Sequence, residues 1–143
     1  MTLSLSVLPD AHLCMVEGEG LVTRQDIEGY LAHSIKAGAK NYAKLVDLRS
    51  STLSLDPDDL EIVANGLLRY SMGEQPGPVA MVVGNALTLD MAVLLKQRVG
   101  DRPFRIFTSV TAARAWIVNF RHTAQPTFLP SGSNPAGRGF RIT

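Results

Sequence analysis

The chain opens with apolar residues that alternate with serine, and this period of two predicts a strand with one solvated face over residues 3–7. Pro9-Asp10 supplies a turn, and His12–Glu17 then has the pattern of a second strand. An antiparallel hairpin is the natural pairing of two strands joined so closely. Gly18 and Gly20 are expected to end the second strand.

A short aliphatic run over Lys44–Arg49 predicts a strand buried inside a sheet, and Ser50-Ser51-Thr52 is expected to form a polar loop after it. Helix signals flank this run, Thr23–Ala37 before it and Asp56–Tyr70 after it. The first opens like a capping box, and the second opens with an aspartate followed by proline, which is typical of a helix start.

Two further units of strand and helix follow. Val79–Val83 is uniformly apolar and predicts a central strand, and a helix after Asn85 is expected to stop at Gly100. Phe104–Phe107 predicts the last strand. Ser109 is expected to cap a final helix that carries large apolar residues as far as Phe120.

The length of 143 residues is near that of one domain, and we expect an α/β domain over residues 1–121 with a Pro/Gly-rich tail over residues 122–143. The tail retains apolar side chains at Phe128, Leu129, Phe140 and Ile142. A purely solvated segment does not need them. We therefore expect the tail to cross the domain or to reach a neighbouring subunit.

Charge is balanced overall but unevenly distributed. The net charge is +1, which gives no general attraction to nucleic acid or to an anionic membrane. All 13 acidic residues lie at or before Asp101, where eight Lys or Arg leave a net charge of −5, and six Arg follow with no acid. The two parts attract each other, or the basic end meets an acidic partner; both interpretations stay open.

Other sequence features concern location and thiol chemistry. The single cysteine, Cys14, cannot form an intrachain disulfide and is expected to be a small buried side chain. The early apolar residues lack the pattern of a signal peptide, and no run reaches the roughly 18 apolar residues of a membrane span. We expect a soluble cytoplasmic protein without a membrane span.

The order of elements, β-β-α-β-α-β-α-β-α, resembles the SpoIIAA-like (STAS) domains. The resemblance is carried by the segments Leu13–Thr23, Leu45–Arg49, Val79–Gly84, Phe104–Phe107 and Ala112–Ile117. It implies a mixed sheet in which an N-terminal antiparallel hairpin precedes strand-helix units, with the helices tending to lie on one face. It also implies relatives that bind anions, nucleotides or lipids. The Asp-Ser pair of the phosphorylatable anti-sigma-factor antagonists is missing, because the helix opens with Asp56-Pro57, so the chain is more similar to a bacterial branch without a phosphoserine switch.

Polar side chains follow three of the predicted parallel strands, and the carboxyl ends of such strands share one edge of a sheet. These candidate ligand-binding residues are Arg49, Ser50, Ser51, Asn85, Thr108 and Ser109. Beside helix N-termini, they are suited to a phosphate or carboxylate. The alternative is that Asn85 and Ser109 only cap helices and Arg49 pairs with an acid. Asp47, within a buried-looking strand, is expected to face the open side of the sheet or to pair with Arg49 or Arg105.

Catalytic and metal signatures are not found in the sequence. The acids over residues 56–61 are compatible with a metal site, but the helix dipole is sufficient to explain them. We therefore expect no catalytic residue, metal or cofactor. The sequence predicts a non-enzymatic interaction or regulatory module, associating with itself as a homodimer or with another protein. The alternative function is binding of a small anionic or lipid-like ligand at the carboxyl edge.

Overall fold

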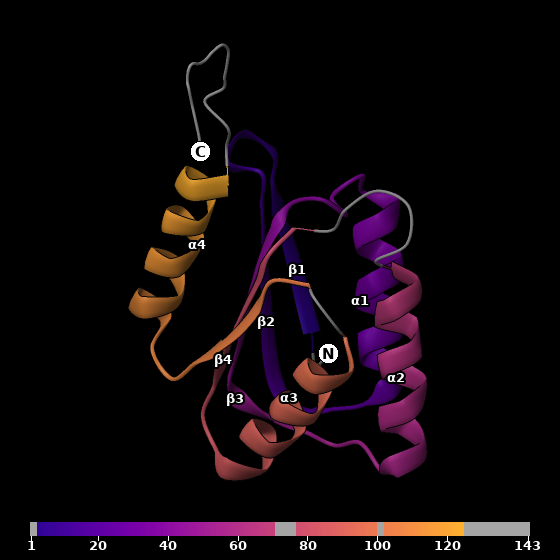
Figure 1. The fold of residues 1–143 in the computed structure, drawn as a ribbon. Coiled ribbons are helices and arrows are strands. Elements are labelled where there is room, and N and C mark those ends of the chain that lie inside the picture. Colours follow the sequence, from indigo (N-terminus) through magenta and orange to yellow (C-terminus); the bar gives the residue numbers. More distant parts are fainter. Residues whose placement is uncertain (1–2, 71–76, 100–101, 125–143) are drawn as a thin grey trace.

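A computed structural model describes residues 3–70, 77–99 and 102–124, and these residues form a five-stranded mixed sheet (Figure 1). The spatial order follows the chain, with β1 antiparallel to β2 and the remaining neighbours parallel. The strands are β1 (Leu3–Leu8), β2 (Leu13–Val22), β3 (Ala43–Leu53), β4 (Val79–Val83) and β5 (Phe104–Phe107). The α/β class, the N-terminal hairpin and the later strand-helix units are therefore confirmed.

The helices lie on both faces of this sheet, which corrects the expectation of a single covered face (Figure 1). Helices α1 (Arg24–Lys36), α2 (Pro57–Tyr70) and α3 (Ala86–Arg98) cover one face, and α4 (Val110–Ala124) packs on the other against β3, β4 and β5. Both faces of the central strands are consequently buried, which explains why all five residues of β4 are buried.

β3 and β4 are parallel neighbours, as the sequence predicts, with Lys44 beside Val79 and Leu48 beside Val83. Alternate residues of β3 enter two separate cores. Val46 and Leu48 join the larger core beneath α1, α2 and α3, whereas Leu45 joins a smaller core beneath α4. The smaller core contains Ala43, Ala80 and Ala113, and these short side chains allow α4 to approach the sheet closely.

Two predicted strand ends are wrong, and the same pairing explains both. β2 continues past Gly18 and Gly20 to Val22, with a register irregularity between Glu17 and Glu19. The residues predicted to form a loop, 50–52, instead extend β3 to Leu53. The two extensions pair with each other, and the buried Ser51 lies beside Gly20 in the ladder. Tertiary pairing thus overrides the turn tendency of glycine and serine.

The final helix extends to Ala124, past the domain boundary predicted at residue 121. The apolar residues of the predicted tail lie outside the described residues. Within the described ranges, no helix has the length and apolar character needed to cross a membrane.

Candidate functional site

The carboxyl ends of the parallel strands place the predicted ligand-binding residues at one edge of the sheet. Arg49 and Ser50 lie near the end of β3, Asn85 follows β4, and Thr108 and Ser109 follow β5. Because β3, β4 and β5 are consecutive neighbours, the topology brings these residues to a common edge. Their side chains nevertheless divide into three separate environments.

Arg49 forms a forked ion pair with Asp47. Its Nε and Nη2 donate to the two carboxylate oxygens at 2.9 and 2.8 Å, and the Arg49 backbone N–H donates to Oδ1 at 3.1 Å. These bonds hold the pKa of Asp47 below its ordinary value, although partial burial acts in the opposite direction. The expected pairing of Asp47 with Arg49 is confirmed.

The Asp47–Arg49 pair borders a polar hollow of about 360 Å³ on the face that carries α4. Ser50 also lines this hollow, together with Ser4, Glu17, Gly18 and Glu19. Three carboxylates therefore surround one guanidinium that is already paired. The excess of negative charge repels an anion. Anion binding at this hollow therefore stays a prediction, and the local charge does not support it.

Ser51 and Asn85 belong to a polar network that closes the start of α3. Asn85 Nδ2 donates to the Ser51 carbonyl at 2.9 Å, and Asn85 Oδ1 accepts from the Thr88 N–H at 2.8 Å. Thr88 Oγ1 in turn accepts from the Leu53 N–H at 3.1 Å. The Ser51 hydroxyl is buried, and a Cβ on Gly18 would approach its oxygen to 2.4 Å. The Asn85 and Thr88 side chains thus join strand to helix, whereas the Ser51 hydroxyl has no hydrogen-bond partner among the described residues.

The third environment is the start of α4, where Thr108 and Ser109 are exposed. Ser109 Oγ accepts from the Ala112 N–H at 3.3 Å and caps the helix. The other helix starts are capped similarly. Asp56 Oδ1 accepts from the Asp59 N–H at 2.8 Å, and the Thr23 N–H donates to Asp26 Oδ2 at 2.9 Å. The capping interpretation of this edge therefore agrees with the geometry.

A basic cluster lies at the opposite, amino edge of the sheet, around the buried ring of Tyr70 at the end of α2. Lys40 Nζ and Lys44 Nζ each lie 5.6 Å from the ring centroid, and the Arg102 guanidinium lies 5.4 Å from it. The Tyr70 hydroxyl is 2.7 Å from Ser34 Oγ. Such distances are within the range of cation–π attraction.

Lys44 is fully buried, and its ammonium donates to the carbonyls of Ala39, Lys40 and Tyr42 at 2.8, 2.6 and 2.8 Å. Burial lowers the pKa of Lys44 to about 8. Sequence reasoning missed this cluster. One signal was present, because Lys44 shares the inward face of β3 with Val46 and Leu48, where a lysine is unusual. Arg102 precedes a short strand and carries no periodic signal.

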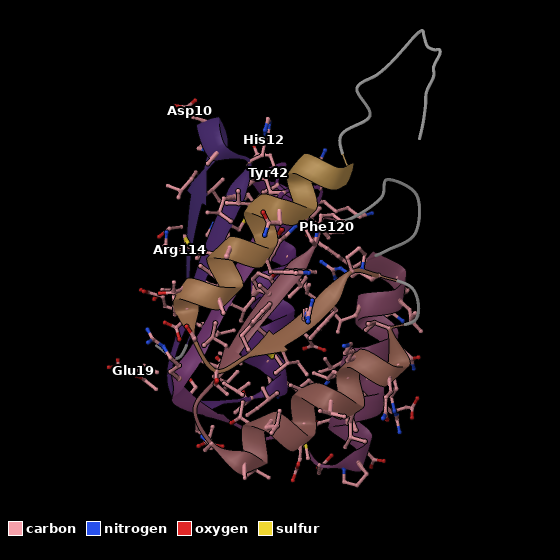
Figure 2. The ribbon with its side chains drawn as sticks, turned by 60° about the vertical axis from the view of Figure 1, so that its left-hand side comes forward. Asp10, His12, Glu19, Tyr42, Arg114 and Phe120 are labelled. Carbon is pink, nitrogen blue, oxygen red and sulfur yellow. The ribbon has the colours of Figure 1, made fainter. Side chains whose placement is uncertain are left out.

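A third feature is the part of the sheet that α4 leaves uncovered. Figure 2 shows α4 in front of the sheet, with the hairpin that carries Asp10 and His12 extending beyond it. On this face Ser4 and Ser6 are exposed, Leu8 is 43% exposed, and Met15 is half-buried. β1 also forms an edge of the sheet, since among the described strands it pairs only with β2.

Comparison with known proteins identifies the fold. No protein-family model and no curated protein matches the chain. Among solved structures, the chain is similar to an uncharacterised protein of the DUF3478 family from Shewanella loihica PV-4, described as having a SpoIIAA-like fold. The TM-score is 0.50 and the identity 19%, with 80% of this chain and 91% of that chain covered. The predicted SpoIIAA-like fold is thus confirmed, and the likeness extends to the fold alone.

Proposed function

We propose that this SpoIIAA-like protein is a non-enzymatic interaction module that forms a homodimer through the outer edge of β1. The observation that carries the proposal is the unprotected character of that edge. β1 is six residues long, contains neither charge nor proline, and pairs with β2 without a bulge. Sheet edges in monomeric proteins are usually blunted by such devices, because free backbone groups pair readily with another strand.

A second copy of the chain provides a matching partner for β1. Antiparallel pairing of two β1 strands about a two-fold axis provides hydrogen-bond partners for the free backbone groups of both edges. It leaves no β1 edge to which a third copy could add. The same association places the open faces of two hairpins side by side. Leu8, Leu13 and Met15 then contribute apolar contact surface beside the backbone hydrogen bonds.

Sedimentation equilibrium of the full chain and of Ser6→Lys tests this proposal. Ser6 is exposed in the middle of the edge strand, and a lysine there repels its counterpart across the two-fold axis and resists burial. We expect a dimer for the unmodified chain and a monomer with unchanged circular dichroism for Ser6→Lys. Ser54→Lys places the same charge on an exposed serine outside the sheet and is expected to remain a dimer. A monomeric unmodified chain, or a dimer that Ser6→Lys leaves intact, contradicts the proposal.

The second candidate function is binding of a small anionic or lipid-like ligand. At the carboxyl edge, the candidate side chains are already engaged in an ion pair or in helix caps, and carboxylates lie around Arg49. A different place, at the amino edge of the sheet, fits this chemistry better.

A further inference from the structure

A cavity of about 70 Å³ lies between the sheet and the three helices α1, α2 and α3. Its wall is almost wholly aliphatic and aromatic, with contributions from Val16, Val46, Leu48, Met81, Leu95 and Phe104. Two lining residues are polar, Tyr30 from α1 and Arg102, which precedes β5. An apolar space with one basic end is the general form of a site for an amphipathic anion.

The guanidinium of Arg102 is incompletely satisfied. Its Nε is buried and has no hydrogen-bond partner among the described residues, and its Nη2 reaches the Gly77 carbonyl only at 3.4 Å. None of the ion pairs found among the described residues includes Arg102. Burial also lowers the pKa of Arg102 from its ordinary value. Arginines with buried guanidinium atoms are usually paired with an acid, and none of the described residues supplies one to Arg102.

The described groups that interact electrostatically with Arg102 are Lys44, Tyr30 and Tyr70, and none of them is a carboxylate. Lys44 lies against the same Tyr70 ring, but three backbone carbonyls occupy its ammonium protons. Burial raises the pKa of Tyr30 above its ordinary value, so its hydroxyl keeps its proton near neutral pH. Arg102 and Tyr30 together therefore present donors at one end of an apolar space.

We propose that the cavity binds a short-chain monocarboxylate, with the carboxylate on Arg102 and Tyr30 and the alkyl chain against the apolar wall. A planar carboxylate matches the fork of a guanidinium, and its one negative charge would balance that of Arg102, which forms no ion pair with the described residues. A cavity of about 150 Å³ accommodates benzene, so a volume of about 70 Å³ admits a chain of about three or four carbons. The inference does not depend on the proposed dimer.

Titration of the isotope-labelled full chain with sodium pentanoate tests the site directly. We expect saturable shifts of the Met81 and Leu95 methyl resonances and a rise in Tm. Pentanamide has the same shape without the charge, and acetate has the charge without the chain. Both are expected to bind at least tenfold more weakly than pentanoate. Equal binding of pentanamide, or shifts confined to residues outside the cavity, overturns the proposal.

Two variants separate recognition of the carboxylate from recognition of the chain. Arg102→Gln is expected to weaken pentanoate binding at least tenfold, whereas Arg105→Gln, which removes an exposed arginine from β5, leaves it unchanged. Val46→Leu enlarges a wall residue and is expected to weaken pentanoate binding while Arg102 is intact. If Arg102→Gln does not fold, Val46→Leu still tests whether pentanoate occupies the cavity. Unchanged affinity in either folded variant contradicts the assignment.

Discussion

Lys44 shows how one side chain determines local structure at the amino edge of the sheet. The end of α1 is joined to β3 by residues 37–42, and three carbonyls of this connection point at a single ammonium. Each bond is charge-assisted, and the ammonium is an additional donor to the carbonyls of Ala39 and Lys40, which also accept from the backbone N–H groups of Tyr42 and Gly77. The lysine thereby adds three side-chain bonds to a connection that lies outside helix and strand.

Replacing this lysine is expected to be costly. Lys44→Met retains the length of the side chain but removes the donors, so the free energy of unfolding should fall by about 2 kcal/mol at pH 7. Urea denaturation measures the difference. Lys36→Met removes an exposed lysine at the end of α1 and should change stability by less than about 0.5 kcal/mol. Equal stability of the two variants would show that the three bonds contribute little.

The same lysine predicts a pH dependence. Because the pKa of Lys44 is lowered to about 8 in the folded protein from 10.5, the unfolded chain binds more protons between these values. Stability due to Lys44 therefore increases with pH across this window, by about 1 kcal/mol between pH 8 and pH 9. Because Lys44 itself lowers the pKa of Cys14, the comparison is made between Cys14→Ala and Cys14→Ala/Lys44→Met, in which the raised pKa of Tyr30 acts on both proteins. A difference that stays constant or decreases with pH contradicts the lowered pKa.

Helix α3 is connected to β3 through its first cap, and the two functions of Asn85 can be tested separately. Asn85→Ser retains a cap acceptor but loses the bond to the Ser51 carbonyl, which should cost about 1 kcal/mol. Asn85→Ala loses both interactions and should cost about 2 kcal/mol. Thermal unfolding followed by circular dichroism measures both variants. Identical losses would assign the whole effect to the cap.

The elements predicted well from sequence are those in which local pattern and burial agree. Val79–Val83 and Phe104–Phe107 have the predicted bounds, since each is a short apolar run beside turn residues. The ends of β2 and β3 were wrong because glycine and serine were interpreted as turn residues. Gly18 is required inside the strand, where a Cβ would approach Leu48 to 2.8 Å. Such close packing depends on the neighbouring strand and has no local signal.

The candidate site was predictable in position but not in chemistry. Parallel topology alone brings Arg49, Asn85 and Ser109 to one edge, and that placement follows from the order of elements. Their partners depend on side-chain geometry, and in the structure all three are occupied by an ion pair or by caps. The unsatisfied Arg102 was not identified, because its environment is assembled from α1, α2 and β5, which are distant in sequence.

The feature that was hardest to predict from the sequence was which face of the sheet each helix covers. The side of the sheet on which α4 packs depends on the direction of the chain after β5, at the edge of the sheet, and no residue pattern specifies it. The alanines beneath α4 are the physical consequence of this placement. Ala113 is fully buried against the sheet, whereas Ala112, its neighbour on the helix, is exposed.

This contrast gives a matched test of the second layer. Ala113→Leu inserts three carbons where the helix meets Ala80 and Leu45, and overpacking should lower the free energy of unfolding by about 1–3 kcal/mol. Ala112→Leu adds the same group on the solvated side and should change stability by less than about 0.5 kcal/mol. Chemical denaturation followed by the fluorescence of Trp116, which packs against the same core, reports both effects. Equal tolerance of the two leucines would mean that α4 does not pack on this face in solution.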